Sequence, residues 1–163
     1  MQPDLFGVPP HKPAQSYRIP IYKIALVREA ALTVCQPPQL CSSAQAVSVI
    51  RTYLAETDRE HLLVLTVDTR NRLIGINTVS VGSLNSSLGH PREIFKAAIL
   101  QNAAAIILAH NHPSGDPTPS SEDRALTERI KQAAELLGIR LLDHIVVGDG
   151  TERFFSFLDE GLL

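Results

Sequence analysis

The chain of 163 residues contains no tryptophan, one methionine and two cysteines, and aromatic residues make up only 5% of it. Two thiols cannot build a disulfide framework or a four-cysteine zinc site, so we expect a cytoplasmic protein. The longest apolar run, around 103–109, is too short to span a bilayer, and residues 1–13 lack the layout of a secretory signal. These shortages argue against disulfide-stapled secreted proteins and membrane proteins.

The chain also lacks a large excess of charge of either sign. Asp, Glu, Lys and Arg together make up 20% of the chain, and the formal net charge is −2 without a cluster of basic residues. Proteins that bind nucleic acid directly usually carry a basic patch, so we regard direct nucleic-acid binding as unlikely. Hydrophobic residues make up 44% of the chain, which predicts a compact domain with an aliphatic core.

The first third of the chain divides into two parts. Residues 1–16 hold four of the eleven prolines, which predicts a flexible tail. Residues 17–58 should form a strand and a helix that pack on the core. The apolar alternation from Tyr17 to Val27, interrupted by Pro20, favours an edge strand, and Ser42 or Ser43 can begin a helix that runs to about Thr57.

Residues 59–163 should form the main domain. Two β-rich segments, 61–68 and 73–81, flank a polar turn and predict a hairpin. A helix from Pro91 to about Asn102, a buried strand over 104–109, a helix from an N-cap at Ser120 to Gly138, and strands over 141–147 and 153–158 should follow. The order predicts an α+β or α/β domain in which helices flank a mixed β-sheet.

Two histidines stand where the buried strand ends. Because side chains alternate along a strand, His110 and His112 should lie on the same side and converge on one ion. Asp123, in the first turn of the next helix, can turn its carboxylate back toward them. Three ligands of the N, N and O type suit Zn²⁺ and leave a fourth position for water, as in catalytic zinc sites.

Each part of this pattern also has a simpler explanation. Ser120 and Asp123 match a capping box, in which both side chains satisfy backbone donors at a helix start. An isolated H-x-H motif is common. His144 fits a satisfied sheet residue better than a fourth ligand, and Asn111 should point away from both histidines and brace the loop. The metal hypothesis therefore depends on the combination.

The segment HNHPSGDPTPSSED (His110–Asp123) resembles the H-x-H-P…S-x-x-D signature of the JAB/MPN/JAMM metalloprotease-like superfamily, and its wording is close to that of the bacterial RadC family. The resemblance covers about residues 59–148 and includes LLDHIVVG (Leu141–Gly148). It implies the JAMM fold, with His110, His112 and Asp123 as zinc ligands, and makes 59–163 a RadC/JAMM metal-binding domain.

The resemblance also implies a glutamate that acts as general base and a serine that polarises the scissile carbonyl. Ser120 matches the serine, and Glu60, at the start of EHLLVLTVD, corresponds in order and placement to the glutamate. Glu93 is the competing candidate, although an acid in a first helical turn also has a structural reason. The implied reaction is hydrolysis of an amide by zinc-activated water.

The amino-terminal tail carries a second resemblance. Gln2, Asp4, Leu5 and Phe6 lie in QPDLF, which is similar to the Q-x-[SD]-L-F peptide that docks replication and repair proteins on the DNA polymerase sliding clamp. The alternative is an ordinary disordered terminus.

These features favour a zinc metallopeptidase or isopeptidase that acts on a peptide or protein and is linked to DNA repair or replication. A metal-dependent, nucleic-acid-processing repair protein is one alternative, although the helix-hairpin-helix region of longer RadC proteins is not recognisable here. A non-catalytic MPN interaction module is the other.

Overall fold

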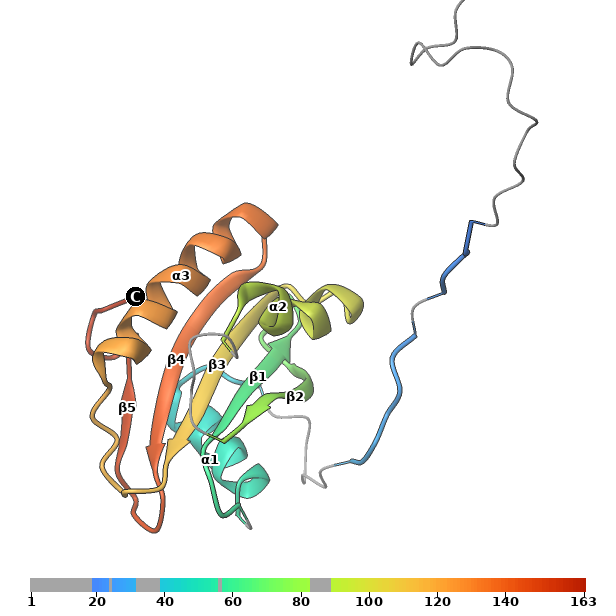
Figure 1. The fold of residues 1–163 in the computed structure, drawn as a ribbon. Coiled ribbons are helices and arrows are strands. Elements are labelled where there is room, and N and C mark those ends of the chain that lie inside the picture. The colour runs from blue at the N-terminus through green and yellow to red at the C-terminus, as the bar shows by residue number, and fades with distance from the viewer. Residues whose placement is uncertain (1–18, 24, 32–38, 56, 83–88) are drawn as a thin grey trace, which may run out of the picture.

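The computed structural model describes residues 19–23, 25–31, 39–55, 57–82 and 89–163. These residues form a mixed five-stranded sheet and three helices, an α+β arrangement that confirms the predicted fold class and is consistent with the JAB/MPN fold (Figure 1). In chain order the elements are α1 (Ser43–Tyr53), β1 (His61–Val67), β2 (Leu73–Val81), α2 (Pro91–Leu100), β3 (Ala105–His112), α3 (Ser121–Leu137), β4 (Arg140–Gly148) and β5 (Phe154–Ser156).

The strands lie side by side in the order β2-β1-β3-β4-β5. The predicted hairpin joins β1 to β2, and β1 also pairs antiparallel with β3. The β3–β4 pair is parallel, so the chain needs a crossover between them, and α3 supplies it. The central strands β1 and β3 are buried along nearly their whole length, which explains their almost uninterrupted apolar sequence.

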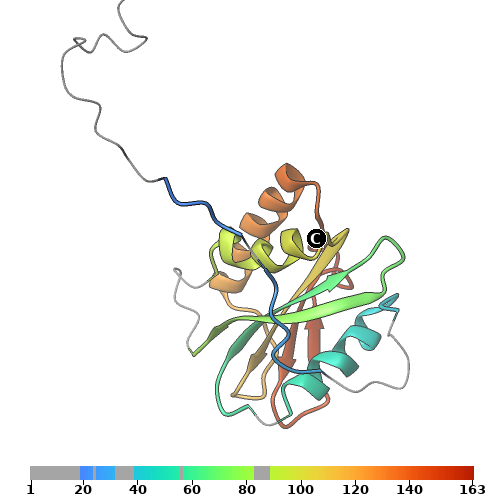
Figure 2. The same ribbon diagram turned by 90° about the vertical axis from the view of Figure 1, so that its right-hand side faces the viewer.

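Helices cover both faces of the sheet. Helix α1 packs on one face through Val47, Ile50 and their neighbours, against alternate residues such as Leu63 and Ala109. Helices α2 and α3 pack on the opposite face, against the other set, which includes Leu62 and Leu108 (Figure 2). Each strand side chain therefore belongs to either the α1 face or the α2–α3 face.

The ends of α3 follow the sequence signals. Ser120 is the N-cap and forms a capping box with Asp123, and Gly138 ends the helix in the left-handed conformation at φ 66°. Pro91 begins α2, as expected for a residue that has no N–H to leave unpaired. None of the helices in the described part of the chain is long and apolar enough to cross a membrane.

Two elements predicted from the sequence differ from those in the structure. Helix α1 ends at Tyr53 rather than near Thr57, where the Thr57 N–H and hydroxyl both donate to the carbonyl of Leu54. Within the predicted edge strand, residues 19–23 and 25–27 form no strand, and the Ile21 side chain is 99% exposed. Alternating apolar residues make a strand only when a neighbour pairs with them.

The predicted clamp peptide, residues 2–6, lies outside the described residues.

Candidate metal centre

The two histidines of the H-x-H motif lie on β3 itself, which continues to His112. They alternate with Asn111, so both imidazoles face the α2–α3 side of the sheet. His110 is fully buried, and the His112 side chain is 19% exposed. Their Nε2 atoms lie 3.0 Å apart. The two imidazoles therefore converge. The pair is closed to solvent at His110 and open to it at His112.

Asp123 reaches the histidines from the first turn of α3. Its Oδ1 lies 3.2 Å from Nε2 of His110, and its Oδ2 lies 3.6 Å from Nε2 of His112. The carboxylate is almost completely buried. The loop of residues 113–119, in which Gly115, Pro117 and Pro119 are buried, reverses the chain and holds the helix start over the strand end.

The capping box and the metal-ligand arrangement coexist. Oδ2 of Asp123 accepts hydrogen bonds from the Ser120 backbone N–H at 2.8 Å and from the Ser120 hydroxyl at 2.7 Å. The Ser120 Oγ in turn accepts from the Asp123 N–H at 3.1 Å. These bonds orient the carboxylate and leave Oδ1 facing His110. Helix capping is thus part of the way in which the site is positioned.

Glu60 lies beside the histidines because of strand register. Leu62 pairs with His110, and continuing this antiparallel register by two residues places Glu60 opposite His112. Glu60, His110 and His112 each offer a ligand atom, and these atoms lie within 4.8 Å of one another. Glu93 instead forms ion pairs with Lys96 and with Arg92 on the exposed side of α2. The geometry thus brings Glu60 to the centre.

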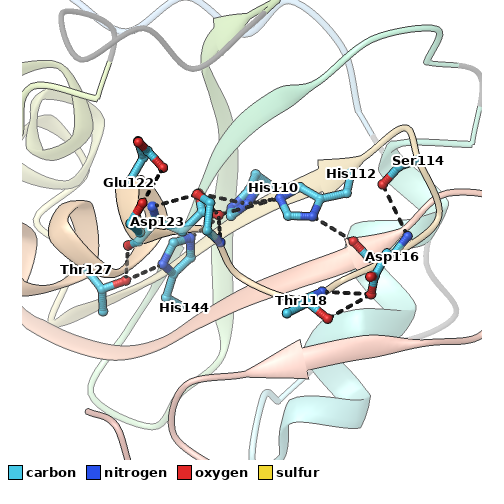
Figure 3. Close-up of polar contacts among 11 residues, drawn as sticks. His110, His112, Ser114, Asp116, Thr118, Glu122, Asp123, Thr127 and His144 are labelled. Atoms are coloured by element: carbon cyan, nitrogen blue, oxygen red, sulfur yellow. Dashed lines mark hydrogen bonds and ion pairs between the residues drawn. The ribbon is translucent and has the colours of Figure 1, made fainter.

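Hydrogen bonds at the outer nitrogen of each imidazole, Nδ1, determine that Nε2 faces the centre (Figure 3). Nδ1 of His112 lies 2.7 Å from the carbonyl oxygen of Asp116. A carbonyl only accepts, so Nδ1 carries the hydrogen and Nε2 of the neutral ring keeps its lone pair. The carbonyl of Asp116 therefore acts as an outer partner of His112.

A series of three hydrogen bonds orients the His110 imidazole in the same way, with Nε2 toward the centre. The Thr127 hydroxyl donates to the Asp123 carbonyl at 2.7 Å, so its Oγ1 accepts from Nδ1 of His144 at 2.6 Å. Nε2 of a neutral His144 then accepts from Nδ1 of His110 at 2.9 Å. The Nε2 atoms of His110 and His112 therefore both point their lone pairs into the space between the two rings.

The electrostatics of the centre favour a positive charge beside Asp123. Burial acts to raise the pKa of Asp123, but the neighbouring imidazoles of His110 and His112 and the hydroxyl of Ser120 outweigh burial, so its pKa lies far below the usual value. The neighbouring Asp123 carboxylate raises the pKa of His112. Burial, followed by the nearby His110, lowers the pKa of His144 well below its ordinary value. A neutral His144 can accept the proton of His110.

These donors fit a metal ion. Two lone pairs aimed at each other across 3.0 Å repel, and a buried carboxylate beside them is unstable without a positive charge. A cation shared by the two nitrogens and the carboxylate removes both costs. Two imidazoles and a carboxylate suit zinc, and the outer hydrogen bonds to both rings are typical of metal-ligating histidines.

Comparison with known proteins shows the family of the chain. Residues 40–162 match the family described as the RadC-like JAB domain. The chain belongs to this family.

Several proteins called UPF0758 resemble this RadC-like domain. One from Moorella thermoacetica is 58% identical over 106 residues, which cover 65% of this chain and 45% of the relative. One from Desulfitobacterium hafniense is 48% identical over 126 residues, covering 77% and 55%, and one from Desulforamulus reducens is 45% identical over 139 residues, covering 85% and 58%. The chain thus spans about half the length of these relatives.

Two partners of the site histidines carry little signal in the sequence of this RadC-like domain. Thr127 lies one helical turn after Asp123, where its hydroxyl can donate to the Asp123 carbonyl, but a threonine inside a helix does not by itself mark a site. His144 is a satisfied sheet residue, as predicted, and the residues that satisfy it are His110 and Thr127. Asn111 points away from the histidines as predicted. It contacts Arg59, His61 and Asp149 rather than the loop that follows.

Proposed function

We propose that this RadC-like domain is a zinc-dependent metallohydrolase, a peptidase or isopeptidase that cleaves an amide bond in a peptide or protein. The observation that carries the proposal is the convergence of His110, His112 and Asp123 on one point, with the Glu60 carboxylate beside them and one open side at His112. Three protein ligands with an open side are typical of catalytic zinc sites.

The proposed reaction divides the work among the described side chains. Zinc, when bound, supplies a Lewis acid that acidifies a water molecule and polarises the substrate carbonyl. Glu60 accepts the proton of the attacking water and returns it to the leaving amine. The Ser120 hydroxyl stabilises the developing oxyanion. For that role it has to turn its proton away from Asp123, to which it donates in this structure.

Metal content and hydrolysis test the proposal separately. We expect the purified protein to hold about one zinc ion per chain, and His112→Ala to lose it, as measured by atomic absorption. Glu60→Gln should still bind zinc at stoichiometric concentrations, although with lower affinity because a carboxylate beside the ion is lost, and should lower the hydrolysis of a set of peptide- and isopeptide-linked fluorogenic substrates by about 10² to 10⁴-fold, the usual worth of a general base. Metal-free wild-type protein would contradict the zinc site.

The other two functions remain as outcomes of the same experiment. A nucleic-acid-processing protein would cleave oligonucleotides with the same dependence on His112 and Glu60, although the net charge of −2 does not favour it. A non-catalytic module would bind metal and cleave neither substrate class. The proximity of Glu60 to both histidines supports a catalytic site over a vestigial one.

We also propose that Gln2, Asp4, Leu5 and Phe6 dock the protein on the DNA polymerase sliding clamp. The support is the sequence pattern QPDLF alone. Such docking would bring the hydrolase to replicating DNA without direct binding to nucleic acid.

A further inference from the structure

Asn111 separates the two histidines along β3, and its side chain points to the opposite face of the sheet. It is completely buried. Its Oδ1 accepts from the backbone N–H of His61 at 2.8 Å, and its Nδ2 donates to the carbonyl of Arg59 at 3.1 Å and to the Asp149 carboxylate at 2.7 Å. The proposed hydrolytic reaction uses neither the Asn111 carboxamide nor its three partners directly.

The partners of Asn111 settle the orientation of its carboxamide. The N–H of His61 only donates and must face the oxygen, whereas the carbonyl of Arg59 only accepts and must face the nitrogen. The Arg59 carbonyl belongs to the peptide group that enters Glu60, and the His61 N–H belongs to the one that leaves it. One carboxamide therefore holds both peptide groups that flank the Cα of Glu60.

A contact from the other side completes the restraint. The carbonyl of Glu60 accepts from the N–H of Gly82 at 2.8 Å, so the peptide group between Glu60 and His61 is held at both ends. Glu60 itself precedes β1, and the last regular β1–β3 pair is that of Leu62 with His110. The Asn111 side chain extends this pairing past its backbone end, to the residue that bears the proposed base.

We propose that Asn111 is a positioning residue, whose carboxamide fixes the backbone of Glu60 and thereby directs the Glu60 carboxylate to the His110–His112 pair. This inference rests on the proposed role of Glu60. A functional side chain has to be held within about 0.5 Å of its working position, and a residue at the end of a strand lacks the ladder that would hold it. Asn111 supplies that support from between the two ligands.

A double-mutant cycle on metal affinity tests this without any substrate. The affinity for Co²⁺ is measured by competition with a chelator for Asn111→Leu and Asn111→Ser, each in the wild-type chain and in Glu60→Gln. Both Asn111 variants are neutral, so they leave the charge of the site unchanged. We expect about a tenfold loss of affinity in the wild-type chain, the lower end of the range for outer-shell residues, and less than about twofold in Glu60→Gln.

A merely structural role gives a different pattern. The proposal would be overturned if the Asn111 variants lost the same Co²⁺ affinity in both backgrounds, or if neither lost any. It would also be overturned if Glu60→Gln alone bound Co²⁺ as tightly as wild type. Thr66→Val is the matched control, because it removes a buried hydroxyl on β1 that bonds Gly75 and Gln101, far from Glu60. It should lower the free energy of unfolding without changing Co²⁺ affinity.

Local exchange gives a second readout, and the two Asn111 variants guard against misfolding. Amide hydrogen exchange at His61 should accelerate in Asn111→Ser, which keeps a polar side chain at this buried position and serves if the leucine variant does not fold. Unchanged exchange at His61 would contradict the hydrogen bond on which the inference depends. Failure of the hydrolase proposal would appear instead as absence of cleavage, with the metal-affinity cycle unaffected.

Discussion

Single side chains outside the ligand set control how the histidines present their nitrogens. His144 accepts the Nδ1 proton of His110, and Thr127 orients His144 in turn. His144→Phe keeps a flat ring that can stack on Phe157 but leaves the His110 proton without an acceptor. We expect zinc affinity to fall by about 10- to 100-fold, as measured by competition with a chelator.

Thr127→Val is the companion variant for this prediction. It acts one bond farther from the metal ligands, so it should weaken zinc binding less than His144→Phe does. If His144→Phe binds zinc as tightly as wild type, the hydrogen-bond chain does not orient His110.

Asp143 is a buried carboxyl outside the metal centre, and burial raises its pKa against the lowering effect of hydrogen bonds from Ser156 and from the Leu158 N–H. A carboxyl whose pKa is higher in the folded state contributes stability that is fully present below its unfolded pKa of about 3.8 and is lost as pH rises through the folded value. The charged form therefore works against folding near neutral pH.

Asp143→Asn should remove this dependence, because an amide accepts and donates in the same place without ionising. We expect the urea midpoint of the variant to rise relative to wild type as the pH increases from about 3.8 toward 7. Asp159→Asn, an exposed neighbour whose charge also raises the pKa of Asp143, should shift the midpoint in the same direction by less. A difference that stays constant with pH would contradict the assignment.

Among the residues of the centre, those that carry a sequence motif could be predicted, and those that depend on register could not. His110, His112 and Asp123 lie within fourteen consecutive residues and are recognisable by spacing. His144 becomes a partner of His110 only through the packing of β4 against β3, where it pairs with Leu108. Asn111 was correctly placed on the opposite face by alternation, but its contacts with Arg59 and His61 depend on where β1 ends.

At the scale of helices and strands, prediction succeeded where a local chemical signal marks an end. Ser120 and Gly138 bound α3 as expected, since a cap and a left-handed glycine act within a few residues. The end of α1 was missed because Thr57 bonds the Leu54 carbonyl through both its N–H and its hydroxyl, which ends the helix without glycine or proline. Helix termination by side-chain competition leaves little trace in a sequence.

Two serine caps allow the structural and functional parts of capping to be separated. Ser120 caps α3 and bonds the Asp123 carboxylate, whereas Ser42 caps α1 by accepting from the N–H of Gln45 and is far from the site. Ser120→Ala and Ser42→Ala should each cost about 1 kcal/mol of unfolding free energy in urea titrations, the usual worth of a cap.

Only Ser120→Ala should also weaken zinc binding, because it frees the Asp123 carboxylate to rotate. Ser120→Thr keeps the hydroxyl and should restore both properties. Equal zinc affinity in the two alanine variants would show that the cap does not help to hold Asp123 in place.

On the scale of the whole molecule, the candidate metal centre joins elements that are distant in the chain. Glu60 precedes β1, the histidines end β3, and Asp123 begins α3, so the crossover between β3 and β4 closes the site. The described residues from 39 onward contain every one of these groups. The proposed clamp peptide, residues 2–6, supplies none of these groups, so substitutions in it should not affect metal binding.

Clamp binding can therefore be tested on the intact chain without disturbing the metal centre. Leu5→Ala combined with Phe6→Ala should weaken binding to purified sliding clamp by at least about tenfold in calorimetric titrations, because burying each apolar side chain is worth about 1.5–3 kcal/mol. Val8→Ala, an apolar change outside the motif, should bind like wild type, and so should His112→Ala. Equal binding by the double variant and wild type would mean that QPDLF is an ordinary terminus and would overturn the proposed docking on the clamp.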